Sequence, residues 1–273
     1  MYAGFLFRQV WVCRGTERRD SGRGRMMAWK QEKEAFASEI LALLYKNKMI
    51  RTFYRDKRDG WTLISGLYSP LYIQLRPLVS YPLVFEKVCR AMTRMVQEEA
   101  PEITRVVGIA MAGVPIAAGM SMLGIPAGFT RKMDNVKSLE SFKEAISKYG
   151  EHSLLEGELA SGDRLALVDD LVTRFDSKLV AMEQVKYEVQ KKGLLDIDVR
   201  TVLVVLDREQ GGKEAAQKAN IKLLSVIPFK TVGLPLLKGV MHPTEWDIIH
   251  RYLQDPAEFQ NKSEQERIAK LRT

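Results

Sequence analysis

Apolar residues recur along the chain in two patterns that predict different elements. Between residues 29 and 48, Phe36, Ile40, Leu43 and Leu44 fall on one face of a helix, with polar residues between them. Further on, short apolar runs such as "RVVGIAM" and "RLALV" are typical of strands buried on both faces. Segments with helical spacing separate these runs. This alternation predicts an α/β fold, with a central, mostly parallel sheet flanked by helices.

The domain organisation follows from where this alternation begins and ends. The stretch "GWTLISGLYSPLYIQLR" is strand-like but broken by Ser-Gly and Ser-Pro, which predicts a hairpin. Residues 133–160 are polar, except that Leu139, Phe142 and Ile146 have helical spacing, so we expect an inserted helix in a loop. We therefore expect a hood at about 28–80 and a core at about 81–230 in one domain, 28–255. A disordered basic leader, 1–27, and a polar tail, 256–273, would flank it.

Composition narrows the classes of partner. The formal charge is +8, but half of it comes from the first 25 residues, so no nucleic-acid partner is expected beyond that leader. A transit peptide is a less favoured interpretation of the leader. No apolar run is long enough to cross a bilayer, and no membrane partner is expected. Cys13 and Cys89 cannot form a disulfide framework, which favours a reducing cytoplasm.

Charged residues stand at the ends of two predicted strands. Asp169 and Asp170 end one of them, and ligands of parallel α/β sheets bind at the carboxyl ends of strands. Adjacent acids there suit vicinal ribose hydroxyls, or Mg²⁺ through water. The alternative is an acidic strand end that caps the next turn. Arg208 follows Asp207 at the next strand end and could offer a bidentate fork to a carboxylate or ring carbonyl, or form a surface pair with that acid.

Further cations lie around the long loop. Arg131 and Lys132 stand at its mouth, where they suit a pyrophosphate or form a solvated basic turn. Lys148 lies near its end, on a segment that could close over a phosphorylated substrate or be an ordinary surface loop. No Ser-His-Asp arrangement, cysteine nucleophile or dinucleotide-binding glycine motif suggests itself.

Five segments together resemble orotate phosphoribosyltransferase, most closely the form fused into UMP synthases. They are "GWTLISGLYSPLYIQLRPLVSYP", "VVGIAMAGVPIAAGMSMLGIPAGFTRK", "KYGEHSLLEG", "LALVDDLVTRFDSKL" and "VLDREQGGK". The resemblance implies a type I phosphoribosyltransferase fold with a small N-terminal hood. It implies transfer of ribose 5-phosphate from phosphoribosyl pyrophosphate (PRPP) to orotate, giving OMP and pyrophosphate. It also implies Mg²⁺, held through PRPP and water, and a homodimer whose catalytic loop enters the neighbour's site. No segment after residue 230 suggests OMP decarboxylation.

The resemblance also implies residue roles. Asp169 and Asp170 would hold the ribose hydroxyls and act in catalysis together with Lys148. Thr173 and Arg208 would recognise orotate, and Arg131 and Lys132 would bind pyrophosphate. The PRPP loop would comprise Asp169, Asp170, Leu171, Val172, Thr173, Arg174, Phe175, Asp176 and Ser177.

The phosphate end of this loop departs from the family pattern. Phe175 takes a glycine position, and Asp176 replaces a small or hydroxyl residue. We expect Asp176 to cap the following helix, which would put its carboxylate where the 5′-phosphate should lie. At about 4 Å the repulsion would be roughly 1 kcal/mol per charge pair in water and about 4 at an effective dielectric near 20.

Two departures lie elsewhere. Ile64 stands where the family has a lysine, and the family's loop lysine falls on Ser147, one place before Lys148. Two hypotheses remain. One is an active orotate phosphoribosyltransferase, or one with an altered base acceptor, which the retained base-side residues favour. The other is a catalytically weakened relative that binds a nucleotide or sugar phosphate in a regulatory role.

Overall fold

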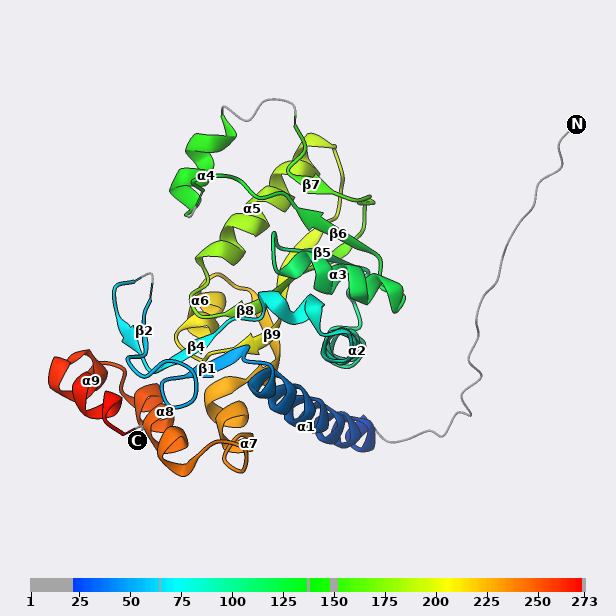
Figure 1. The fold of residues 1–273 in the computed structure, drawn as a ribbon. Coiled ribbons are helices and arrows are strands. Elements are labelled where there is room, and N and C mark those ends of the chain that lie inside the picture. The colour runs from blue at the N-terminus through cyan, green and yellow to red at the C-terminus, as the bar shows by residue number, and fades with distance from the viewer. Residues whose placement is uncertain (1–21, 64, 137, 148–151, 272–273) are drawn as a thin grey trace, which may run out of the picture.

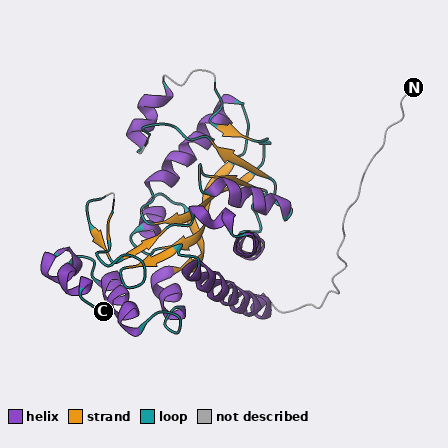
Figure 2. Ribbon diagram, viewed as in Figure 1, coloured by secondary structure: helices purple, strands orange, loops and turns teal. Residues whose placement is uncertain are grey.

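The computed structural model describes residues 22–63, 65–136, 138–147 and 152–271. Its centre is a six-stranded sheet with the order β10-β9-β8-β5-β6-β7 (Figures 1 and 2). All neighbouring strands in it are parallel except the edge pair β6–β7. The strands are β5 (Arg105–Gly108), β6 (Ala127–Thr130), β7 (Leu155–Glu156), β8 (Arg164–Val172), β9 (Asp198–Asp207) and β10 (Lys222–Pro228). The predicted α/β class is confirmed.

Helices cover both faces of the sheet because its buried strands are apolar on both sides. Val106 faces a core with α1 (Gly22–Lys46), α2 (Pro82–Glu99) and α3 (Gly113–Met122). Its neighbour Val107 faces a second core with α5 (Asp176–Lys191) and α6 (Gly212–Lys218). Successive residues of a strand point to opposite faces, so one short apolar run supplies both cores.

The hood consists of short antiparallel pairs at one end of the sheet. β1 (Ile50–Thr52) pairs with β4 (Leu71–Ile73), and β2 (Trp61–Thr62) pairs with β3 (Tyr68–Ser69). The 3₁₀ turn η1 (Arg76–Ser80) then leads into α2. This hairpin arrangement agrees with the broken strand pattern of the sequence. It brings the end of β4 and the start of η1 toward the carboxyl edge of the sheet.

The first helix begins inside the segment that we expected to be a disordered leader. Residues 22–27 form the first turns of α1, while residues 1–21 lie outside the described residues. Arg25 Nε donates to Glu98 Oε2 on α2 at 2.8 Å, and Trp29 Nε1 donates to Glu99 Oε1 at 2.8 Å. These contacts between helices support the start of α1, so the leader boundary at residue 27 was too late.

The C-terminal segment is also more ordered than we expected. After η2 (Phe229–Gly233) and α7 (Leu234–Leu236), the chain forms α8 (Pro243–Gln254), η3 (Glu258–Gln260) and α9 (Lys262–Ala269). The expected polar tail, 256–273, therefore contains helical structure as far as residue 269. Phe259 and Ile268 are fully buried, which anchors this segment despite its polar composition. Among the described residues, no helix has the length and apolar character needed to cross a membrane.

The long loop carries the helix that the sequence predicted. α4 (Leu139–Ile146) begins at Ser138, which forms a capping box with Ser141. Phe142 is buried in a small cluster with Met133, Leu154 and Val180, the last of these on α5. Figure 1 shows α4 lying beside α5. This part of the loop is thus packed on its own chain.

Candidate active site

The two strand ends that the sequence marked, those of β8 and β9, lie side by side next to the end of β5, because β5, β8 and β9 are consecutive parallel strands. Gly113 permits α3 to start against β8: an added Cβ would lie 2.0 Å from the carbonyl oxygen of Val168. At this edge lies a cavity of about 650 Å³, here called the strand-end cavity. It is lined by Tyr72, Ile73, Gln74, Arg76, Ile109, Ala110, Met111, Ala112, Lys132, Asp169, Asp170, Leu171, Ser177 and Lys178.

The acidic pair is joined by a buried lysine. Lys178 Nζ donates to Asp169 Oδ2 at 2.7 Å and to the carbonyl oxygen of Leu171 at 2.8 Å. Asp169 Oδ1 accepts the backbone N–H of Asp170 at 2.9 Å, and Asp170 Oδ1 accepts that of Leu171 at 2.7 Å. A carboxylate has about four lone-pair positions, so both acids keep capacity for ligand hydroxyls. The structure places Asp169 and Asp170 in the strand-end cavity, near the end of β8.

Burial also changes the ionisation of the pair. Removal from water and, to a smaller extent, the charge of Asp169 raise the pKa of Asp170 to about 7, although Lys178 opposes the rise. Asp170 therefore exchanges its proton near neutral pH. In its ionised form it accepts hydrogen bonds from a ligand, and in its protonated form it can donate one.

The phosphate end of the loop differs from the expected arrangement. Phe175 is 2% exposed and packs in the core on the α5 side of the sheet, with Val172 and Val185. Its φ of −102° is ordinary for any residue, so the backbone does not require glycine there. Phe175 also occupies the N-cap position of α5, without a side-chain capping hydrogen bond.

Asp176 does not cap α5, contrary to our expectation. It is the first helical residue, one position beyond the N-cap, so its carboxylate is not placed to cap the helix. Asp176 and Ser177 are both exposed on the first turn. The N–H groups of a first turn lack partners within the helix, and they suit a phosphate. Asp176 is therefore a charge beside a candidate phosphate site rather than a group that fills it.

Arg208 is buried with unused hydrogen-bonding capacity. Its backbone N–H donates to Val172 O at 3.0 Å, which places it beside the end of β8. The residue is 7% exposed, and its Nε and Nη2 have no partner among the described residues. Burial lowers the pKa of Arg208, and Tyr252 on α8 opposes the lowering. Buried donors normally have partners, so this fork suits a ligand carboxylate or carbonyl.

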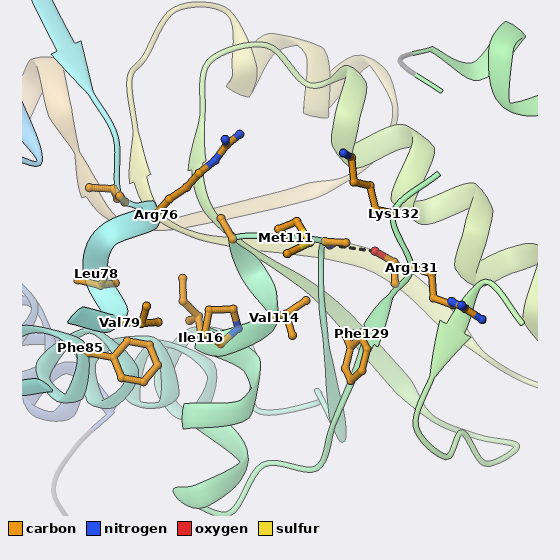
Figure 3. A pocket seen from close by; sticks show the side chains of 15 residues that line it. Arg76, Leu78, Val79, Phe85, Met111, Val114, Ile116, Phe129, Arg131 and Lys132 are labelled. Atoms are coloured by element: carbon orange, nitrogen blue, oxygen red, sulfur yellow. Dashed lines mark hydrogen bonds between the residues drawn. The ribbon is translucent and has the colours of Figure 1, made fainter. Parts of the chain in front are cut away.

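A second cavity of about 650 Å³ adjoins the first and is mainly apolar. It is lined by Leu75, Arg76, Leu78, Val79, Phe85, Ala110, Met111, Ala112, Val114, Pro115, Ile116, Phe129, Thr130, Arg131 and Lys132 (Figure 3). Arg76 and Lys132 line both cavities and extend to the same side in Figure 3. Arg131 turns aside, with Nη1 at 3.6 Å from Glu156 on β7.

Some of the predicted site residues line the strand-end cavity, and others do not. The strand-end cavity includes Asp169, Asp170, Leu171, Ser177 and Lys132, and lacks Val172, Thr173, Arg174, Phe175, Asp176, Arg131 and Arg208. Lys148 and Ile64 lie outside the described residues.

Sequence reasoning gave no site role to Arg76, and it assigned Lys178 only a partial offset of the repulsion between Asp176 and the phosphate. A signal for each was present in the sequence. Arg76 ends the quoted "LYIQLR" segment, and Lys178 falls on the inner face of α5 at helical spacing from Ala181 and Val185, which are buried.

The described residues do not fit a divalent metal ion bound by the protein. Among them, no group of three or more His, Cys, Asp or Glu side chains could hold a metal. In the strand-end cavity the carboxylates come from Asp169 and Asp170, and Asp169 already contacts the ammonium of Lys178. A divalent cation at this pair would meet a buried like charge, which disfavours it.

The fold is that of the type I phosphoribosyltransferases. The structure of orotate phosphoribosyltransferase from Aeropyrum pernix matches with a TM-score of 0.57 and 23% identity, covering 74% of this chain and 97% of that one. The chain is a relative of the orotate phosphoribosyltransferases.

Curated relatives agree with this assignment. The enzyme of that name from Methanococcus maripaludis is 24% identical over 69% of this chain and 94% of its own length. Uridine 5′-monophosphate synthase of Caenorhabditis elegans is 29% identical over 79% of this chain, which spans only 41% of that relative. No protein-family model matches the chain.

Proposed function

We propose that the chain transfers ribose 5-phosphate from PRPP to orotate in pyrimidine biosynthesis, giving OMP and pyrophosphate. One observation carries the proposal: a single cavity at the carboxyl edge of the sheet joins the acidic pair to Arg76 and Lys132. This combination suits a ligand with both ribose hydroxyls and a diphosphate. The names of the relatives supply the base acceptor, orotate. The regulatory alternative has no observation in its favour.

In this proposal each part of the substrate has a protein partner. Asp169 and Asp170 accept hydrogen bonds from the ribose hydroxyls, and Arg76 and Lys132 neutralise the diphosphate. The 5′-phosphate lies at the first turn of α5, beside Ser177. Arg208, at the end of the neighbouring strand, offers its free N–H groups to the carboxylate or a carbonyl of orotate, with Thr173 beside it.

The reaction then exchanges one bond at the anomeric carbon for another. The bond between C1 of ribose and the diphosphate oxygen breaks, and its electron pair leaves with pyrophosphate. A ring nitrogen of orotate forms the new bond to C1, and the proton that this nitrogen carried is released to pyrophosphate or to solvent. Positive charge develops on the sugar during this exchange, so Asp169 and the ionised form of Asp170 would stabilise it electrostatically. Exclusion of water from the site protects the sugar from hydrolysis.

Three further parts of the proposal come from the resemblance. Mg²⁺ would enter on the diphosphate of PRPP rather than on a protein site. A second copy of the chain would complete the enzyme as a homodimer, and exposed apolar residues on the second cavity, such as Val79 and Phe129, support such a contact. The cytoplasm is the proposed location, and the buried free thiol of Cys89 fits a reducing compartment.

The direct test is turnover. Purified protein mixed with PRPP, Mg²⁺ and orotate should consume orotate and release pyrophosphate in equal amounts. Arg208→Gln should lose most of this activity, whereas Arg200→Gln, an exposed change on β9, the strand that Arg208 follows, should keep it. Absence of turnover at high enzyme concentration, in both the forward and the reverse direction, would reject the proposed reaction.

A further inference from the structure

Lys178 occupies a position where an apolar residue would be ordinary. It lies in the first turn of α5, on the face that also carries the buried residues Ala181 and Val185. Its side chain is 5% exposed, although the neighbouring Asp176 and Ser177 are exposed to solvent. A buried ammonium loses its hydration and is retained only with close partners. The position therefore calls for an explanation in terms of what the ammonium contacts.

Its contacts are all at the candidate sugar site. The ammonium donates to Asp169 Oδ2 and to Leu171 O, and Lys178 lines the strand-end cavity together with both acids. An ammonium has three donors, so one N–H remains for an oxygen of a bound ligand. Lys178 thus brings a fixed positive charge and a free donor to the place where two carboxylates and a polyanionic ligand would meet.

A divalent cation would serve the same electrostatic purpose. It would offset the repulsion between the carboxylates and the ligand's phosphates, and it would polarise the ligand oxygens. The ammonium of Lys178 and a divalent cation exclude each other at the acidic pair, because the same carboxylates would hold both of these cations in a buried site. The described residues include no cluster that could hold the metal elsewhere.

We propose that Lys178 is a built-in replacement for the divalent cation at the acidic pair, so that phosphoribosyl ligands bind in the strand-end cavity without Mg²⁺. The inference rests on the proposed function, since it concerns the same ligands. It goes beyond that function by assigning a role to a residue outside the expected site. It also reverses the metal dependence that the resemblance implies.

Equilibrium binding of PRPP and of OMP to the full chain tests this, by calorimetry in EDTA and in excess Mg²⁺. The expected result for the wild type is a Kd that differs by no more than about twofold between the two conditions. Binding that weakens about tenfold or more in EDTA overturns the inference and leaves the proposed function standing. Failure of both ligands to bind in either condition overturns both.

Variants separate this role from a purely structural ion pair. Lys178→Met should lose affinity about tenfold or more in EDTA and regain it in Mg²⁺, whereas Lys178→Arg should keep metal-independent binding. Lys186→Met, an exposed change on the same helix, is the matched control and should behave as the wild type. If Lys178→Met does not fold, a double variant with Lys178→Met and Asp169→Asn replaces it. We expect ligand binding by this double variant to become dependent on Mg²⁺ to the same extent. Equal binding with and without Mg²⁺ by Lys178→Met, or by the double variant that replaces it, overturns the inference.

Discussion

The Nζ atom of Lys178 lies 2.7 Å from Oδ2 of Asp169, in a pair whose side chains are only 5% and 11% exposed. Asp169 ends the apolar part of β8, and Lys178 lies in the first turn of α5, so the contact closes the turn between strand and helix. The pair therefore has two roles. It fixes the geometry of the loop that a phosphoribosyl ligand would contact, and it sets the charge of the acidic site.

The structural role predicts a large effect of breaking the pair on stability. Lys178→Met leaves two carboxylates in a buried site with no cation, and loss of one partner of a buried pair typically costs about 3–5 kcal/mol. The Lys178→Met, Asp169→Asn variant should recover most of this free energy of unfolding, because it removes the uncompensated charge. Urea denaturation of both variants measures the difference. A loss below about 1 kcal/mol in the single variant would show that the pair is not a buried ion pair in solution.

The raised pKa of Asp170 predicts a pH dependence of stability that is opposite to the usual one for a carboxyl. The folded value is about 7 and the ordinary value is 3.8, so the folded state holds the proton over a range where the unfolded state has released it. The contribution of Asp170 is therefore fully present below about pH 4 and is lost as the pH rises toward about 7. Thermal unfolding across this range should show the slope, and Asp170→Asn should lack it. An unchanged slope in Asp170→Asn would assign it to another group.

Replacing Arg208 by an apolar residue should affect protein stability and ligand affinity in opposite directions. Within the described part of the chain, Nε and Nη2 of the buried guanidinium have no partner and only Tyr252 interacts favourably with its charge, so Arg208→Met removes a poorly compensated cation and should leave stability equal or higher. The same change should weaken OMP binding by about 2–5 kcal/mol, or roughly thirtyfold and more, because the anionic base loses its fork. Thermal unfolding and calorimetry measure the two effects. A strong loss of stability would mean that Arg208 has an internal partner in solution.

Much of this fold could be predicted from the sequence because its strands are short, apolar and separated by helices. Apolar runs such as the one around Val106 identify buried strands, and right-handed crossovers then leave few possible arrangements. The inserted helix α4 was also predictable, since Phe142 has helical spacing with its apolar neighbours. The ends were less predictable. Phe259 and Ile268 are isolated apolar residues in a polar segment, and only tertiary packing determines that they are buried.

Some features of the candidate site could also be predicted from the sequence, and others could not. The position of Asp169 followed from its place at a strand end, because parallel strands bring their carboxyl ends to one edge. The contact with Lys178 did not follow, since it depends on which turn of α5 faces the sheet and on how far an extended side chain reaches. The conformation of Phe175 could not be inferred either. A glycine position suggests an unusual backbone, yet here an ordinary φ and a core contact suffice.

Asp176 predicts a modest electrostatic penalty on phosphate binding. Its exposed carboxylate lies on the first turn of α5, so repulsion of a 5′-phosphate at about 4 Å should cost about 1 kcal/mol in water, or roughly fivefold in affinity. Asp176→Ser should recover this factor at low salt and lose the gain at high salt. Calorimetry with ribose 5-phosphate measures it. Changing Phe175 at the same time would confuse the result, because truncating a buried Phe typically costs about 3–5 kcal/mol. A salt-independent gain would point to a steric rather than an electrostatic cause.

The exposed apolar residues near the second cavity predict the site of self-association. Val79 is 50% exposed and lines that cavity, and Leu83, four residues further on, is 74% exposed in the first turn of α2. Charges at both positions, Val79→Glu with Leu83→Glu, would have to be buried in a contact between two copies, so the proposed homodimer should dissociate while each chain stays folded. Light scattering gives the mass, and thermal unfolding checks the fold. Leu195→Glu is the matched control, because Leu195 is 73% exposed in the turn between α5 and β9, away from this surface. A dimer that survives the double change but not Leu195→Glu would place the contact on another face.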